Sequence, residues 1–476
     1  MSELRTTILN PPAASGERFI REGRCMQSVD SWAAIWPPLT LAYLAAIAQK
    51  FGPVDLFDAN VEEELTLEKA IKRVEEFKPD IIVVNTAFPS IEFDGEAARL
   101  LKEACPGALV VGFGVFFTLL KDDSMKACPA FDVGIVGEAE ATFKEILERR
   151  AADKDLSGCQ GTMWRKGNDI VVEEKRPLIE DLDILPRPAR ELLHNESYVL
   201  PNNGRPFTLV NAARGCPYEC IFCIAPIYYG RKLRRHSLDY ILGEIEHCMN
   251  EYGLKDFLMW EEIFTLDKKF GNEFCDALIE KNWDISWAAT TRADALEEGL
   301  LCKMKQSGLF LLGLGIESGC QEILDAANKK EKVEEVKRGV DLCHKVGVKT
   351  MGHFIFGLPG ETEETAERTI EYALSLGLDY LQCYVAVPYP RTPLGDLAKE
   401  KGWIVSERWS EFDFGGASVM KTDKLSPVQV NEFRDKLFKK FYFRPWYMLG
   451  KVGTLLRRPQ QIFQASKFIN WILRRK

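Results

Sequence analysis

The sequence predicts an α/β protein in which a Rossmann-like, doubly wound parallel sheet precedes a partial (β/α)6 barrel and an α-helical C-terminal tail. Short apolar runs alternate with helical stretches over residues 1–150, and a strand-then-helix pattern resumes at residue 207. The 476 residues exceed one ordinary domain. The predicted division is a first domain at 1–150, an ordered linker at 151–205, a core at 206–395 and a basic helical region at 396–476.

Composition narrows the class of protein. The chain is 46% hydrophobic and 28% charged, as in folded soluble proteins. Its thirteen cysteines are scattered and odd in number, and no signal-like start precedes them, so a secreted disulfide scaffold is disfavoured and the cytoplasm is expected. The net charge of −9 argues against a nucleic-acid partner. The longest apolar runs, 39–48 and 108–120, are too short to cross a bilayer.

The first domain reads as alternating strands and helices. The expected strands are 6–9, 54–57, 81–84, 109–112 and 133–136, and the expected helices are 39–50, 67–77, 95–104 and 141–150. Ligands of such a sheet bind beyond the carboxyl ends of its strands. No GxGxxG follows the first strand, so a dinucleotide is not indicated. In the linker, Pro186 and Pro188 rule out a regular helix.

The core repeats strand and helix. The expected strands are 207–211, 256–260, 285–289, 310–316, 350–356 and 380–385, and the expected helices are 237–252, 268–281, 297–307, two between 319 and 346, and 363–376. Six such units predict a parallel partial barrel, which reacts at the carboxyl ends of its strands.

Three thiols follow the first core strand within eight residues: Cys216, Cys220 and Cys223. A closed zinc site needs four ligands, and His236 lies outside a compact finger-like spacing, so zinc fits poorly. A 4Fe–4S cluster with one open iron fits better, because soft thiolates suit such clusters. The alternative without a metal site is that the three cysteines are buried thiols, or that two form a disulfide and the third stays free.

The CxxxCxxC spacing, with the aromatic Phe222 before the third cysteine, resembles the radical SAM enzymes. The resemblance implies that the open iron is chelated by the amino and carboxylate groups of S-adenosylmethionine. It further implies that the reduced cluster cleaves this molecule to a 5'-deoxyadenosyl radical, which makes the three cysteines both metal ligands and catalytic. A reductant such as flavodoxin or ferredoxin is the implied partner.

The same resemblance assigns cofactor contacts at later strand ends. Glu262 would accept hydrogen bonds from the methionine amino group, Arg292 would bind the methionine carboxylate, and Glu317 in the GLGIESG run would hold the ribose hydroxyls. Phe222 and Gly357 would border the adenine. A solvated carboxylate pair at 261–262 and an exposed rim arginine are the alternatives.

Further residues on the last two strands could face the substrate. His353 is either a packed core residue or a proton donor or substrate contact. The substrate space could also be lined by Cys383, Tyr384, Tyr389 and Arg391.

Residues 1–150 resemble the cobalamin-binding domain that precedes many radical SAM cores. The resemblance lies in NPP at 10–12, WPPLTLAYLAA at 36–46, GFG at 112–114 and DVGIVGEAEATFKEIL at 132–147, and it continues in LDILPRPAR at 182–190. All five histidines lie beyond residue 150, so the histidine that ligates cobalt from below is absent. Either cobalamin is bound without a histidine ligand, or the domain is empty and covers the active site.

The C-terminal end reverses the charge of the chain. Residues 434–476 carry twelve Lys or Arg against one acid, with aromatic residues along an amphipathic pattern. This pattern predicts either packing on the barrel or peripheral contact with the inner face of a membrane. Membrane contact would suit an apolar small-molecule substrate.

The resemblance is to the branch that includes the magnesium-protoporphyrin monomethyl ester cyclase. It implies a radical enzyme acting on an unactivated carbon of an apolar substrate, with methyl transfer from cobalamin. The alternatives are a cyclase-like oxidation or rearrangement of a tetrapyrrole or lipid, and, in another class, an iron–sulfur sensor or scaffold that binds S-adenosylmethionine without turnover.

Overall fold

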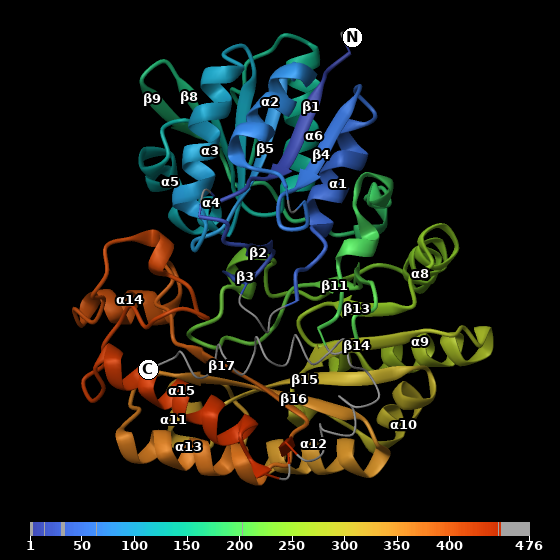
Figure 1. Ribbon diagram of the computed structural model, residues 1–476, viewed down its shortest axis with the longest axis vertical. Helices are drawn as coiled ribbons and strands as arrows, with labels where there is room; N and C mark the ends of the chain where they lie inside the picture. The colour runs from blue at the N-terminus through green and yellow to red at the C-terminus, as the bar shows by residue number, and fades with distance from the viewer. Residues whose placement is uncertain are drawn as a thin grey trace.

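The computed structural model describes residues 3–448, apart from 14, 30–33, 63, 202 and 446. Two α/β units are stacked, one built on a seven-stranded sheet and the other on a six-stranded sheet. The hairpin of β2 (Phe19–Glu22) and β3 (Cys25–Ser28) lies between the two units (Figure 1).

The first sheet is parallel apart from two strands at one edge. Its order is β4-β1-β5-β6-β7-β8-β9, and only the pairings of β8 and β9 are antiparallel. The parallel strands are β1 (Thr6–Asn10), β4 (Val54–Asp58), β5 (Ile81–Thr86), β6 (Leu109–Gly114) and β7 (Val133–Ile135). The predicted doubly wound parallel sheet is therefore confirmed. The strand order reverses between β1 and β5, which is the switch point where ligands of such sheets bind.

Helices cover both faces of this sheet, because successive strand residues bury opposite sides. Ile8 packs in the core beneath α1 and α6, whereas Leu9 packs in the core beneath α2 and α3. The helices are α1 (Leu39–Ala48), α2 (Leu67–Phe77), α3 (Ile91–Ala104), α4 (Val115–Leu120), α5 (Asp122–Ala127) and α6 (Ala139–Ala151). Both faces of the sheet are therefore covered and shielded from water. This explains why its strands are continuous apolar runs.

The first sheet runs past the boundary expected at residue 150. Strands β8 (Thr162–Lys166) and β9 (Asp169–Val172) extend it antiparallel, within the segment expected to be a linker. The sequence of β9 shows no clear alternation of apolar and polar residues, because this edge strand is largely exposed. Beyond it, the described residues of the linker form short 3-10 turns, including Leu182–Ile184 and Arg190–Leu192, and no regular helix, as its prolines predict.

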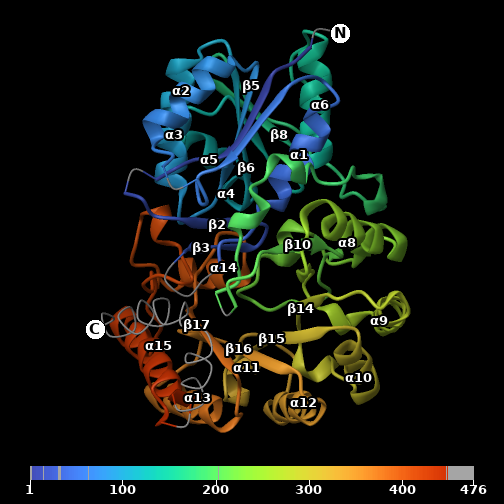
Figure 2. The same ribbon diagram turned by 45° about the vertical axis from the view of Figure 1, so that its right-hand side comes forward.

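The second unit is a parallel sheet with its strands in chain order, β10-β13-β14-β15-β16-β17 (Figure 2). The strands are β10 (Phe207–Asn211), β13 (Asp256–Trp260), β14 (Ser286–Thr291), β15 (Leu309–Glu317), β16 (Lys349–Phe356) and β17 (Tyr380–Val385). The helices are α8 (Leu238–Tyr252), α9 (Lys268–Lys281), α10 (Glu298–Gln306), α11 (Gln321–Ala326), α12 (Val333–Val346) and α13 (Glu363–Ser375). Ser237, Asp267 and Thr362 cap the first turns of α8, α9 and α13.

The C-terminal region contains α14 (Pro393–Glu400) and α15 (Pro427–Tyr442). The aromatic side chains of Phe438, Phe441 and Tyr442 are buried, and the Tyr442 hydroxyl donates to the Leu381 carbonyl of β17 at 2.8 Å. Of the two alternatives predicted for the C-terminal region, packing on the barrel is therefore confirmed for α15. The rest of the basic tail, residues 449–476, lies outside the described residues, so its membrane contact stays a prediction. Within the described ranges, no helix is long and apolar enough to span a membrane.

Candidate active site

A cavity of about 360 Å³ lies between the mouth of the barrel and hairpin β2–β3. Its wall includes Cys216, Cys220 and Cys223 together with side chains from β13 to β17. Volumes of this order are typical of small-molecule sites. The strand ends of the barrel and the hairpin of the first unit thus enclose one site.

The three cysteines sit on a loop closed by a two-stranded ribbon. Strands β11 (Ala213–Arg214) and β12 (Arg234–Arg235) pair antiparallel at its base. Gly215 has φ +102°, and a Cβ there would lie 2.1 Å from the Lys232 carbonyl oxygen, so only glycine fits. The Cys216 amide donates to the Gly230 carbonyl at 3.1 Å, which fixes the first cysteine against the far side of the loop.

The donor set fits a 4Fe–4S cluster. None of the thirteen cysteines forms a disulfide, and burial raises the pKa of Cys216, Cys220 and Cys223, the last to about 12. In the part of the chain that the structure describes, no three His, Cys, Asp or Glu side chains lie close enough together to hold a single ion. A cluster instead takes each thiolate on a different iron, so it needs thiols arranged around a space. The three cysteines on one cavity wall provide that arrangement.

The two carboxylates that follow β13 have different surroundings. Glu262 lines the cavity, its side chain is 8% exposed, and it forms an ion pair with Arg24 at the tip of hairpin β2–β3. Burial raises the pKa of Glu262, and Arg24 opposes this effect. Glu261 points elsewhere and accepts from both terminal nitrogens of Arg235, at 2.7 and 3.1 Å.

Arg292 lines the cavity but already has partners. Its guanidinium donates to Asp294 at 2.7 and 2.9 Å and to the carbonyl of Lys329 at 2.8 Å, and it lies 4.0 Å from the ring centre of Tyr218. A methionine carboxylate would have to share the guanidinium N–H donors with Asp294 and the Lys329 carbonyl. Its assignment to that carboxylate stays a prediction.

Glu317 ends β15 with φ +66°, at a register shift in its pairing with β16. Its carboxylate accepts from Lys329 Nζ at 2.9 Å, and Lys329 lies 3.8 Å from Glu331. A Cβ at Gly315 would lie 2.8 Å from Glu317 Oε1 and 2.9 Å from Lys329 Nζ, so the glycine makes room for this pair. Sequence reasoning missed Lys329, because it belongs to a charged KKE run that looks like a solvated loop.

Of the two residues expected at the adenine, one lines the cavity, and the assignment of both stays a prediction. Phe222 lines the cavity, whereas Gly357 is not among its lining residues. Gly357 has φ +86°, and its amide donates to the buried carboxyl group of Glu361. The turn after β16 is therefore held by a carboxyl group that has no charged partner among the interactions of its side chain.

Glu361 should make the stability of the fold depend on pH. Burial raises its pKa to about 8, against about 4.3 in an unfolded chain. Between these values only the folded state keeps the proton, so the free energy of unfolding should fall as pH rises from about 5 to about 8, by up to about 1.4 kcal/mol per unit. Glu361→Gln should remove this dependence in urea unfolding at pH 5.5 and pH 8. An unchanged pH dependence in the variant would contradict the assignment.

His353 and Tyr384 face the cavity from β16 and β17. His353 Nδ1 lies 3.2 Å from the Tyr384 hydroxyl oxygen, and the rings are stacked. Burial lowers the pKa of His353 to about 4, so its imidazole is neutral. Tyr389 also lines the cavity, whereas Cys383 and Arg391 are not among its lining residues.

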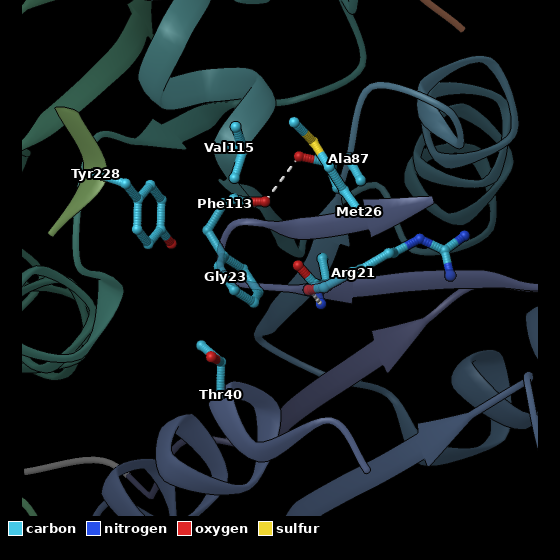
Figure 3. Close-up of a pocket in the computed structure, with 11 residues that line it drawn as sticks. Arg21, Gly23, Met26, Thr40, Ala87, Phe113, Val115 and Tyr228 are labelled. Atoms are coloured by element: carbon cyan, nitrogen blue, oxygen red, sulfur yellow. Dashed lines mark hydrogen bonds between the residues drawn. The ribbon is translucent and has the colours of Figure 1, made fainter. Parts of the chain in front are cut away.

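The switch point of the first sheet carries polar groups that lack partners. Asn10 is the last residue of β1 and Asn85 the next-to-last residue of β5. Both are almost fully buried, and the side-chain oxygen of each has no hydrogen-bond partner among the described residues. A cavity of about 10 Å³, room for one water molecule, lies here between Thr40, Gly114 and Tyr228. Figure 3 shows the Arg21 side chain extending away from this cavity. Its guanidinium donates to Ser90 at 3.0 Å and to Asp94 at 2.8 Å.

These groups fit a ligand that hydrogen-bonds at the strand ends, as cobalamin would. The residues available to hold it are Asn10, Asn85 and the glycine-containing end of β6 at Gly114. A cofactor of that size would have to displace hairpin β2–β3 from the strand ends. No histidine occurs in the first 193 residues, so this domain offers no imidazole to cobalt.

Two family models match the chain. The Radical SAM superfamily matches residues 210–373, and the B12 binding domain matches residues 29–147. The first range contains the cluster loop and four of the six barrel strands in full, and it begins within β10. The second begins directly after hairpin β2–β3 and contains α1 and the switch-point strand β5.

Relatives match over most of their length. An uncharacterized methyltransferase of Pyrococcus horikoshii is 32% identical over 427 residues, covering 89% of this chain and 92% of that protein. The anaerobic magnesium-protoporphyrin IX monomethyl ester cyclase of Cereibacter sphaeroides is 28% identical over 447 residues, covering 89% of this chain and 72% of that protein.

Solved structures share the fold. The cobalamin-dependent S-adenosylmethionine radical enzyme OxsB, solved with aqua-cobalamin and S-adenosylmethionine, gives a TM-score of 0.73 at 13% identity, over 98% of this chain and 71% of that chain. The radical S-adenosylmethionine methyltransferase TsrM from Kitasatospora setae was solved with cobalamin and a 4Fe–4S cluster. It gives a TM-score of 0.67 at 18% identity, over 84% of this chain and 75% of that chain.

The cluster loop, the barrel and the switch-point sheet thus agree with the sequence matches. The predicted cofactors, a 4Fe–4S cluster, S-adenosylmethionine and cobalamin, are confirmed, as is the prediction of an enzyme in place of a sensor. This chain belongs to the radical SAM enzymes that carry an N-terminal B12-binding domain.

Proposed function

We propose that this enzyme methylates a carbon atom of an apolar small molecule. The observation that carries the proposal is the shared cavity, in which the three cysteines of the barrel and the hairpin of the B12-binding unit face the same space. When bound, the cluster and S-adenosylmethionine supply a carbon-centred radical, and cobalamin supplies the methyl group.

The residues of the chain shield and orient this chemistry. Cys216, Cys220 and Cys223 would hold the cluster, while Arg24 and Cys25 at the hairpin tip close the cavity from the side of the first unit. A largely apolar wall keeps water away from the reacting atoms and so protects a radical from side reactions.

The residues that line the cavity favour an uncharged, apolar substrate. Each cation that lines the cavity already has a carboxylate partner: Arg24 pairs with Glu262, Arg292 with Asp294, and Lys329 with Glu317. Most of the other lining side chains are apolar or aromatic, including Trp36, Trp260, Ile263, Leu311, Met351 and Phe414. The neutral His353 and the Tyr384 hydroxyl would bind a polar substituent of an otherwise apolar molecule.

A cyclase-like oxidation or rearrangement is the second candidate. The similarity to the magnesium-protoporphyrin cyclase over 447 residues favours it. The two reactions differ in what becomes of S-adenosylmethionine, because only methyl transfer yields S-adenosylhomocysteine.

The test is anaerobic turnover of the reconstituted enzyme with flavodoxin or dithionite as reductant. S-adenosylmethionine labelled with a trideuterated methyl group would be supplied with cobalamin and a panel of tetrapyrrole esters and isoprenoid lipids. Methyl transfer predicts both S-adenosylhomocysteine and 5'-deoxyadenosine, and a product that carries the labelled methyl group. Substrate-dependent 5'-deoxyadenosine without S-adenosylhomocysteine would refute methyl transfer and support the cyclase-like reaction.

A further inference from the structure

We propose that Glu138 and Glu140 of the B12-binding unit are positioning residues for the cluster loop of the barrel. Their buried carboxylates would hold the ribbon β11–β12 closed and so keep the three cysteines in place. The proposal goes beyond methyl transfer and does not depend on which substrate is used.

The contacts form a four-residue network across the two units. Arg214 Nη2 donates to Glu140 Oε1 at 2.6 Å, and Arg234 donates to both carboxylate oxygens of Glu138, at 2.6 and 3.0 Å. Arg214 also lies 3.5 Å from Glu138, which therefore contacts both arginines. The four side chains are at most 5% exposed.

The two arginines would repel each other without these carboxylates. Arg214 and Arg234 are direct cross-strand partners in the ribbon. Like charges directly opposite one another destabilise an antiparallel pair, and burial removes the water that would screen them. The ribbon is only two residues long on each strand, so it has few hydrogen bonds with which to resist the repulsion.

The ribbon in turn sets the position of the cysteines. Arg214 is followed directly by Gly215 and Cys216, and the Cys216 amide bonds to the Gly230 carbonyl across the loop. Arg234 also donates to the carbonyl of Tyr229 at 2.7 Å, at the end of α7 (Ala225–Tyr228), which follows Cys223. Both ends of the cysteine segment are thus tied to one ion network.

The carboxylates come from the ligand-binding edge of the first sheet. Glu138 lies three residues beyond the end of β7, and Glu140 is in the first turn of α6. Carboxyl ends of parallel strands are where such sheets bind their cofactor. The network therefore connects the cobalamin edge of one unit with the cluster loop of the other.

The test uses the full-length double variant Glu138→Gln/Glu140→Gln, compared with wild type as cluster-free protein by hydrogen exchange. Amide exchange should rise about tenfold or more in residues 213–216 and 230–236 and stay unchanged in β13 to β17. After anaerobic reconstitution, the iron content and visible absorbance of the cluster should fall, and its loss in air should be faster. Unchanged exchange in the loop together with normal iron content would overturn the proposal.

A matched control is Glu244→Gln. Glu244 pairs with Arg190 at 2.6 Å, with both side chains buried, but it lies outside the cluster loop. It should leave loop exchange and iron content unchanged, and an equal effect of this variant would also overturn the proposal.

Should the double variant fail to fold, Glu138→Gln alone should loosen the loop. Addition of Arg234→Met should then restore part of its protection, because the like-charge pair is gone, and a failure of this rescue would count against the proposal.

Discussion

Alanine at Cys216, Cys220 or Cys223 should abolish formation of 5'-deoxyadenosine, down to the level of a reaction without protein. Each cysteine would ligate a different iron, and the fourth iron must stay open for S-adenosylmethionine. With two thiolates on the cavity wall, a second iron loses its protein ligand and the cluster is no longer held. Without it, no electron reaches the sulfonium bond.

Anaerobic iron and sulfide analysis, the visible absorbance of the cluster and chromatographic detection of 5'-deoxyadenosine would measure this loss. Cys302→Ala is the matched control, because Cys302 is exposed on α10 and outside the cavity. It should retain wild-type cluster content and turnover. Persistence of 5'-deoxyadenosine in the three variants, or zinc in place of iron and sulfide in the wild type, would refute the assignment of the cysteines.

Lys329→Met should destabilise the barrel by about 3–5 kcal/mol, because removing one partner of a buried ion pair leaves an uncompensated charge. Lys329 is 5% exposed and lies between Glu317 and Glu331, at 2.9 and 3.8 Å. Burial disfavours its ammonium form, but the two carboxylates outweigh this effect and raise the pKa of Lys329. The ammonium group is therefore charged, and its loss exposes the two glutamates to each other.

Thermal or urea unfolding of the cluster-free protein would measure the change, and equilibrium binding of S-adenosylmethionine to the reconstituted enzyme should weaken as Glu317 is released. Lys337→Met is the control. Lys337 forms an exposed pair with Asp341 four residues on, so its removal should change stability by about 0.5 kcal/mol or less. Equal stability of the two variants would show that the Lys329 network is dispensable.

Local pattern was sufficient for most of the architecture. The strands at 207–211, 256–260 and 380–385 and the helices at 67–77 and 268–281 end at the residues that the sequence predicts. In these elements apolar periodicity, N-caps and turn residues agree, and all of them act over a few neighbouring positions. The same holds for the cluster loop, whose three cysteines lie within eight residues.

By itself, then, the sequence determined the class of fold, the order of the two units and the grouping of three cysteines on one loop, for which it predicts a cluster. Only the tertiary structure showed the hairpin β2–β3 at the cavity, Lys329 between its glutamates, and the contact of Glu138 with Arg234, which are 96 residues apart. Charged residues look like solvated surface in a sequence, because burial and pairing are properties of the assembled chain. A side chain acquires its partner only when distant segments pack, and no local period records that contact.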